Sequence, residues 1–128
     1  MNKPRIFSRL EEVVHLNFCP MFWINTNGIL LGHNKTSLQF LGVLSKLEPN
    51  ESVLLMGKHV RDVCPEKVAN ILLSDMRFMI KEVKVCGREE IVEDVKTKEM
   101  VRYLSKRIPL FDDKKINIIG MLCESMKY

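Results

Sequence analysis

The sequence predicts an α/β (α+β) fold in a single domain, with a leading helix, two strands, several short helices, one long helix and three closing strands. Three observations support this prediction. Two short apolar runs flank a turn at residues 25–28, a helical apolar stripe follows Pro65, and three segments rich in β-branched residues follow residue 90. With 128 residues and 46% hydrophobic content, the chain is long enough to bury its own core without disulfide bonds.

The first predicted element is a helix from Ser8 to about Asn17. Ser8 and Glu11 match a capping box, in which the two side chains bond N–H groups that the first helical turn leaves free. The apolar residues of this helix form one narrow stripe, which must lie either on the domain itself or on a partner. The stripe consists of Leu10, Val13 and Val14.

Residues 22–42, with the sequence FWINTNGILLGHNKTSLQFLG, begin as a β-hairpin and continue as a helix. Residues 22–24 and 29–31 are the predicted strands, and the Asn and Gly residues between them tolerate the positive φ angles of a tight turn. Asn34 stands where a helix N-cap is expected, and Gly42 suits the C-terminal cap. A polar loop at residues 45–52 and a short helical turn at residues 53–56 are predicted to follow.

The long helix is predicted from Pro65 to Val85, because proline suits the first helical position. Its expected buried stripe is Val68, Leu72, Met76, Met79 and Val83. The closing strands are predicted at residues 91–95, 100–108 and 116–123. In the middle strand, Met100, Arg102, Leu104, Lys106 and Ile108 share one face, opposite Val101, Tyr103, Ser105 and Arg107.

Composition argues against several classes of function. The net charge of +4 does not predict nucleic-acid binding, because the 20 basic residues are spread along the chain among 16 acids and aromatic residues make up only 7%. No apolar run approaches the roughly 20 residues of a membrane span, so no membrane contact is expected. The four cysteines form no CxxC pair and no secretory signal precedes them, so we expect free thiols, no zinc site and a cytoplasmic location.

The sequence predicts neither a catalytic nor a metal site. Its three histidines, His15, His33 and His59, lack the HxxxH and HExxH spacings of metal sites, and no serine lies in a GxSxG motif. Glu89 and Glu90 are adjacent on a predicted strand, so their side chains point to opposite faces, and we expect them to solvate an edge. A small-molecule enzyme of α+β fold is therefore disfavoured.

The order of these elements, with the residues that form them, resembles the PAS family of sensor domains. FWINTNGILLGHNKTSLQFLG resembles the opening hairpin and first helix of the family, and MGKHVRDVCPEK resembles its short middle helices. KVANILLSDMRFMIKEV resembles the long connecting helix, while EEIVEDV and MVRYLSKRIPLFDDKKINIIGML resemble the closing strands. The similarity covers roughly residues 18–124 and is greatest to PAS domains of bacterial two-component sensor kinases.

This resemblance implies a five-stranded antiparallel sheet of order 2-1-5-4-3, with helices that enclose a small cavity on one face. It divides the chain into a flanking helix at residues 1–17, a PAS-like domain at residues 18–124 and an exit at residues 125–128 toward an effector domain. The implied function is a non-catalytic sensory and dimerisation domain of a signal-transduction protein, foremost a two-component histidine kinase. The alternative is a protein–protein interaction domain of a transcription regulator. Leu10, Val13 and Val14 are the expected homodimer contacts.

The resemblance also bears on cofactors. Haem-binding members use a histidine on the long helix, which contains none here, and His59 lies just upstream. The photoactive flavin motif Asn-Cys-Arg-Phe-Leu-Gln is not matched by residues 61–66, so neither haem nor a photoactive flavin is expected. A small apolar ligand in the cavity and a core filled by side chains alone remain two alternatives. The cavity residues would be Leu72, Met76, Met79, Tyr103 and Met121.

Cys64 is the candidate for a redox-sensitive residue. It stands at the N-terminal end of the long helix, near Arg61 and Lys67, where the helix dipole and positive charge favour a thiolate. The alternative is that Cys64 is only a small residue beside a helix end.

Overall fold

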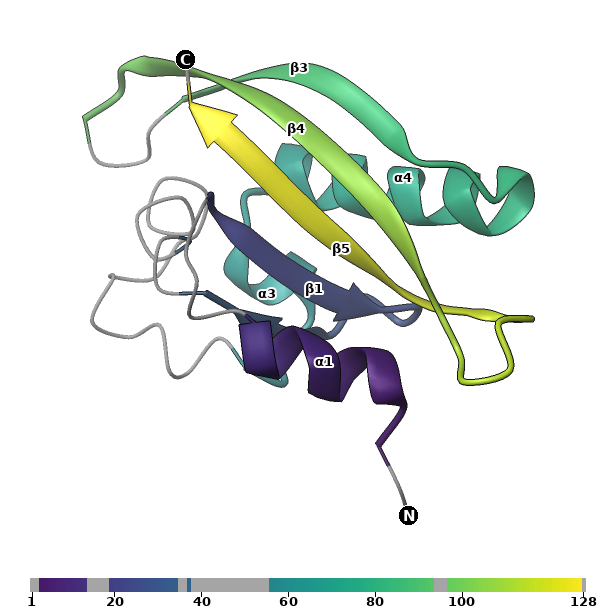
Figure 1. Cartoon of the computed structure of the whole chain (residues 1–128). Coiled ribbons are helices and arrows are strands. Elements are labelled where there is room, and N and C mark those ends of the chain that lie inside the picture. The colour runs from purple at the N-terminus through teal and green to yellow at the C-terminus, as the bar shows by residue number, and fades with distance from the viewer. Residues whose placement is uncertain (1–2, 14–18, 35–36, 38–55, 94–96, 128) are drawn as a thin grey trace.

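The computed structural model describes residues 3–13, 19–34, 37, 56–93 and 97–127, which form five strands and three helices (Figure 1). For Val92 and Lys127 only the backbone is described. The elements are α1 (Arg5–Val13), β1 (Met21–Asn25), β2 (Leu30–His33), α3 (Val60–Val63), α4 (Glu66–Glu82), β3 (Cys86–Glu93), β4 (Met100–Phe111) and β5 (Ile118–Lys127).

The strands form one antiparallel sheet of order β2-β1-β5-β4-β3, which confirms the predicted fold class and strand order. The α3 and α4 helices lie on one face of the sheet, and α1 lies on the other (Figure 1). We call the face toward α4 the inner face and the face toward α1 the outer face. Among the described residues, no helix is both long and apolar enough to cross a membrane.

Each face of the sheet has its own apolar core. On the inner face, Ile24 and Met121 of the central strands pack with Leu72 and Met79 of α4. On the outer face, the Trp23 ring packs so closely over β2 that a methyl group at Gly32 would lie 2.0 Å from it. Trp23 is therefore a packing residue, buried with Phe7, Leu10, Leu110 and Leu122.

The α1 helix begins earlier than the sequence predicts. Its first residue is Arg5, and the Pro4 carbonyl accepts a hydrogen bond from Phe7 N at 3.1 Å. Ser8 consequently lies inside the helix, so the predicted capping box with Glu11 is wrong. The end predicted near Asn17 falls among residues 14–18, outside the described residues.

Asn34 ends the hairpin at the position where the sequence predicts a helix N-cap. Its Oδ1 accepts hydrogen bonds from Met21 N at 3.1 Å and from Ser37 N at 2.9 Å, and the second of these is the bond that an N-cap makes. Its Nδ2 donates to the Cys19 carbonyl at 2.6 Å. One buried amide thus fixes the start of β1 and turns the chain after β2. The remainder of the predicted helix to Gly42, the loop at 45–52 and most of the turn at 53–56 lie outside the described residues.

The stripe predicted on α4 is correct except at its last position. Val68, Leu72, Met76 and Met79 are buried, whereas Val83 is 54% exposed. Val83 has a φ of 54° and caps the helix in the left-handed conformation, so it no longer shares the helical face.

The closing strands are longer than predicted. The β3 strand begins at Cys86, five residues before the predicted start at Ile91, and β5 continues to Lys127. Residues 125–127, expected as an exit from the domain, are therefore still part of the sheet. The two predicted faces of the middle strand are confirmed, because Tyr103, Ser105 and Arg107 are buried while Met100, Arg102, Leu104 and Lys106 are exposed.

Candidate functional site

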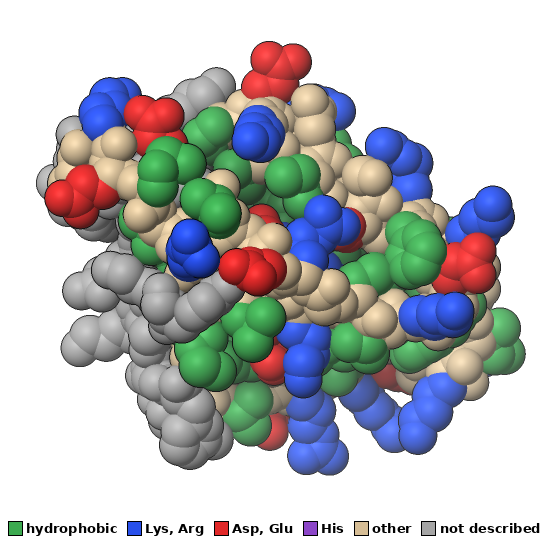
Figure 2. Space-filling view, turned by 90° about the horizontal axis from the view of Figure 1, so that it is seen from above, with side chains coloured by type: hydrophobic (Ala, Val, Ile, Leu, Met, Phe, Trp, Pro, Cys, Tyr) green, Lys and Arg blue, Asp and Glu red, His purple; other side chains and the backbone are tan. Residues whose placement is uncertain are grey.

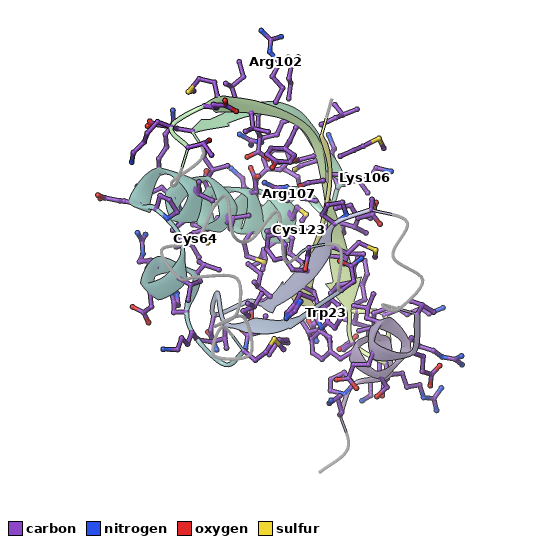
Figure 3. The ribbon with its side chains drawn as sticks, turned by 90° about the vertical axis from the view of Figure 1, so that its left-hand side faces the viewer. Trp23, Cys64, Arg102, Lys106, Arg107 and Cys123 are labelled. Atoms are coloured by element: carbon purple, nitrogen blue, oxygen red, sulfur yellow. The ribbon has the colours of Figure 1, made fainter. Side chains whose placement is uncertain are left out.

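A cluster of four charged side chains lies between α4 and the inner face of the sheet. Arg107 Nη2 donates a hydrogen bond to Glu90 Oε1 at 2.7 Å, and Arg107 Nε lies 3.3 Å from Asp75 Oδ2. Arg88 Nη2 donates to Asp75 Oδ1. The side chains of Asp75 and Arg107 are each 3% exposed. We call these four residues the charge cluster, and Figure 3 shows Arg107 reaching from β4 toward α4 while Lys106 points away.

Strand register places the cluster on one face. Cys86 pairs with Arg107, Arg88 with Ser105 and Glu90 with Tyr103. Alternation along the two strands therefore places the side chains of Arg88, Glu90 and Arg107 on the face toward α4. Asp75 lies three residues after Leu72 on the helix and so shares the buried stripe. The prediction that Glu90 solvates an edge is therefore wrong, whereas Glu89 is exposed as predicted.

Burial is the largest influence on the pKa values of Asp75 and Arg107. Burial raises the pKa of Asp75 above its ordinary value, and the charges of Arg107 and Arg88 oppose this shift only in part. Burial also opposes the charge of Arg107, but the carboxylates of Glu90 and Asp75 raise the pKa of that guanidinium. Arg107 is thus positively charged, and Asp75 takes up a proton more readily than an exposed aspartate.

The raised pKa of Asp75 has a definite effect on stability. The folded state binds this proton more readily than the unfolded chain does. The stability that Asp75 contributes is therefore fully present below the ordinary pKa of 3.8 and is lost as the pH rises through the raised value. When Asp75 is ionised, its buried negative charge is stabilised by its two arginine partners, Arg88 and Arg107.

The structure brings the five predicted cavity residues into one inner-face core. They are Leu72, Met76, Met79, Tyr103 and Met121, and none is more than 4% exposed. Their role around a ligand stays a prediction, since residues 38–55 are not described. The charge cluster beside them was not predicted as a site, although Asp75 within an apolar helical stripe was the signal available in the sequence.

A pocket opens at the sheet edge beside the charge cluster. It lies between the first turns of α4 and the edge strand β3, and its volume is about 510 Å³. Val68 and Ile71 line its helix side, and Arg88 and Glu90 line its strand side. We call this the edge pocket. Two members of the charge cluster therefore form part of its wall.

His59 and His33, the two histidines in the described residues, each contact a neighbouring backbone group. His59 is the N-cap of α3, and its Nδ1 accepts a hydrogen bond from Arg61 N at 3.1 Å. His33 Nδ1 lies 3.0 Å from the Asn34 carbonyl oxygen. Within the described parts of the chain, no group of three or more His, Cys, Asp and Glu side chains is placed to hold a metal ion.

Cys64 lies where the sequence places it, directly before α4, but it is buried. Cys64 is 3% exposed, and its backbone N–H donates a hydrogen bond to the Val60 carbonyl at 2.9 Å. Arg61 donates to Asn70 Oδ1 at 2.8 Å. Nearby Cys123 is fully buried, and burial raises the pKa of its thiol to about 12, so this thiol is neutral at physiological pH.

We predict that the thiols react in an order set by burial. At about pH 8, iodoacetamide should modify the half-buried Cys19 and Cys86 first, although burial raises the pKa of both thiols. Cys64 and Cys123 should react only when the chain unfolds. Peptide mass spectrometry over time measures the order. If Cys64 reacts first in the folded protein, its thiol is accessible and the redox assignment gains support.

The three predicted dimer contacts, Leu10, Val13 and Val14, differ in how far they are buried or described. Leu10 packs within its own chain against the outer face and is 7% exposed, whereas Val13 is 45% exposed. Val14 lies outside the described residues. Leu10 thus packs on its own sheet, and a role of Val13 and Val14 in a homodimer stays a prediction.

Comparison with solved structures identifies the fold. No family model matches the sequence, and no curated protein matches it. VqmA of Vibrio cholerae superposes with a TM-score of 0.72 at 11% identity, over 94% of this chain and 51% of that chain. This chain therefore spans about half the length of VqmA.

Two further structures are matched over most of their own length. The PAS domain of Bordetella pertussis BvgS has a TM-score of 0.68 at 14% identity, over 97% of this chain and 87% of that one. A domain of an HTR-like protein from Haloarcula marismortui has a TM-score of 0.62 at 19% identity, over 84% of this chain and 95% of that one. With the observed strand order, these similarities show that the chain has the fold of a PAS domain.

Proposed function

We propose that this chain is a non-catalytic sensory and dimerisation domain of a signal-transduction protein. It relays a ligand or redox signal to a covalently linked output domain, foremost the kinase of a two-component system. The observation that supports this proposal best is the charge cluster. It joins α4, on the inner face, to β3 and β4, and β4 pairs with β5 as far as Lys127.

The relay is a shift between two packings of α4 against the sheet. Asp75 is the only member of the charge cluster on α4, so a displacement of the helix acts on Arg107 and, through it, on Glu90. Ser105 Oγ and Ser125 Oγ lie 2.9 Å apart and link β4 to the last residues of β5. A signal changes the output only if it stabilises one packing more than the other.

A second function, interaction within a transcription regulator, is favoured by one specific observation. VqmA, whose structures are described as a dimer and as a complex with ligand and DNA, is among the similar folds. The sequence of the complete gene would distinguish the two. A heptad helix with a phospho-acceptor histidine supports the kinase, and a helix-turn-helix supports the regulator.

We propose that the homodimer forms through the part of the outer face that α1 leaves uncovered. This outer patch consists of Ile91, Met100, Leu104 and Met126, which are 48 to 62% exposed. Figure 2 shows hydrophobic side chains among Lys and Arg residues on the face seen from above. A hollow of about 530 Å³ beside Leu104 and Met126 is bordered by Lys106, Glu89 and Glu124. Because both signs of charge border the patch, a second copy related by a two-fold axis can pair them.

We predict a weak homodimer that dissociates when Leu104→Asp is combined with Met126→Asp. Both side chains are more than half exposed in the monomer, so the charges should weaken association without unfolding the domain. Leu10→Asp is the contrasting variant, because it should lower stability at every protein concentration. Sedimentation equilibrium over a wide concentration range is the measurement. A wild-type chain that stays monomeric at the highest concentration contradicts the dimer.

A further inference from the structure

A separate pocket lies on the outer face, between α1 and the end of the sheet where β4 turns into β5 (Figure 1). Its volume is about 620 Å³, within the range of small-molecule sites. One hydrogen bond joins its two sides, because the backbone N–H of Arg5 donates to Asp113 Oδ1 at 2.8 Å. The start of α1 is thereby held to the turn, and we call the space between them the helix pocket.

Much of the wall of the helix pocket is apolar. Ile6 of α1 and Ile108 of β4 line the pocket and are only half buried, so each keeps apolar surface in contact with water. Three buried leucines complete this part of the wall, namely Leu10, Leu110 and Leu122. An apolar body in the pocket would remove the remaining surface of the two isoleucines from water, which stabilises binding.

Two acidic residues line the helix pocket, but hydrogen bonds within the protein occupy them. Asp112 Oδ1 accepts hydrogen bonds from Ile116 N at 2.9 Å and from Asn117 N at 3.2 Å. Its Oδ2 accepts a hydrogen bond from Asn117 Nδ2 at 3.2 Å. These bonds, foremost the one from Ile116, lower the pKa of Asp112. Since Asp113 accepts the bond from α1, both carboxylates already have structural roles.

Three basic side chains line the same pocket and lack an acidic partner. They belong to Arg5 and Arg9 of α1 and to Lys115 in the turn between β4 and β5. All three residues are exposed, and within the part of the chain that the structure describes none of them forms an ion pair. Arg5 and Arg9 are four residues apart and therefore share one side of the helix. Three positive and two negative charges leave the pocket with a formal excess of one positive charge.

We propose that the helix pocket binds an amphipathic carboxylate, a molecule with one apolar chain and one carboxylate head. The chain lies against Ile6 and Ile108, and the head is bound by the guanidiniums of Arg5 and Arg9 and by Lys115. A guanidinium matches a carboxylate with two parallel hydrogen bonds. A head with a single negative charge also balances the formal excess of the pocket, whereas a cationic head would face three like charges.

The helix pocket lies on the face of the sheet opposite the charge cluster. The inference therefore goes beyond the proposed relay and does not depend on it. Because the pocket is formed by α1 together with the β4–β5 end of the sheet, a bound ligand would contact both and hold the helix against the outer face.

Three probes with the same chain and different heads test this class. Decanoate is an anion, decanol is neutral and decyltrimethylammonium is a cation. In an NMR titration of the wild-type chain, below the micelle concentration of each probe, decanoate should shift the amides of Ile6, Arg9 and Ile108. Its Kd should be about fivefold lower than that of decanol, the upper value for one exposed ion pair. Each CH₂ removed from the decanoate chain should raise the Kd about fourfold.

Two pairs of matched variants locate the site. Arg9→Gln should weaken the binding of decanoate about fivefold and leave that of decanol unchanged, whereas Arg77→Gln, at an exposed position of α4, should affect neither probe. Ile108→Trp fills the helix pocket and should abolish the binding of both probes, whereas Ile80→Trp places the same ring on the exposed side of α4 and should preserve it. If Ile108→Trp does not fold, the arginine pair and the three probes still decide, because Arg9 is exposed.

Several outcomes would overturn the inference. Equal affinity for decanoate and decanol, or tightest binding of decyltrimethylammonium, excludes recognition of an anionic head. Absence of binding by all three probes, or binding that Arg9→Gln and Ile108→Trp leave unchanged, excludes the site.

Two other occupants of the helix pocket are also outcomes of the test, and each would overturn the inference. If the chain binds vesicles of anionic phospholipid but not free decanoate, the arginines of α1 contact a membrane surface. If the α1 amides shift only with protein concentration, a second copy of the chain covers the pocket. None of these results bears on the charge cluster, so failure of this inference is distinguishable from failure of the proposed relay.

Discussion

Replacing Arg107 by methionine should lower the free energy of unfolding by about 3 to 5 kcal/mol, the usual cost of removing one partner from a buried ion pair. Methionine fills much of the same volume but leaves Asp75 and Glu90 without their shared cation. Leaving Asp75 without Arg107 should cost more than leaving Glu90 without it, because burial already disfavours the charged form of Asp75 and raises its pKa. Urea unfolding at neutral pH measures the loss.

The matched control is Lys106→Met, one residue earlier on β4. Lys106 is exposed on the outer face, so the same substitution there should change stability by less than about 0.5 kcal/mol. The loss in Arg107→Met should shrink as the pH falls, because Asp75, whose pKa is raised by burial, then becomes neutral. A loss under about 1 kcal/mol at neutral pH, or one independent of pH, would contradict the account of the charge cluster.

Leu72→Ala and Met76→Ala should each destabilise the chain by about 2 to 5 kcal/mol, the range for large-to-small changes in a packed core. The two side chains are 1% and 2% exposed and lie on the face of α4 that packs against the sheet. Because they are one helical turn apart, the double variant should deviate from additivity. Thermal or urea unfolding measures all three variants.

Ser74→Ala and Lys81→Ala are the controls on the same helix. Both residues are exposed and lie off the buried stripe, so alanine should be tolerated at each. If Leu72→Ala and Met76→Ala both cost less than about 0.5 kcal/mol, the inner face of α4 has been assigned wrongly.

The fold was predictable wherever the apolar residues follow the spacing of a helix or of a strand, or a turn motif is present. The α4 stripe, the turn at Gly28 and the alternation along β4 each follow a simple spacing, and the structure confirms them. Gly28 has a φ of 80°, as the tight turn requires. The start of β3 was missed because its inward residues, Arg88 and Glu90, are charged, so the hydrophobic alternation of a half-buried strand is absent.

The charge cluster was harder to predict than the apolar core. Hydrophobic residues at a regular spacing identify Met76 and Met79 as buried, because burial alone stabilises them. A buried charge is tolerated only through partners on other elements, and Asp75, Glu90 and Arg107 are brought together by strand register. The same limit applies to Leu10, since an amphipathic stripe does not tell whether its own sheet or a second chain covers it.

Hydrogen–deuterium exchange in the Asp75→Asn variant tests the proposed relay from α4 to the end of β5 most directly. The substitution weakens the link between helix and sheet with little change in volume, and Ser74→Ala is the neighbouring control. The account predicts faster exchange in β4 and in β5 near Ser125, with a smaller change in β1. Faster exchange confined to α4, or an equal increase in every strand of the sheet, would contradict the relay.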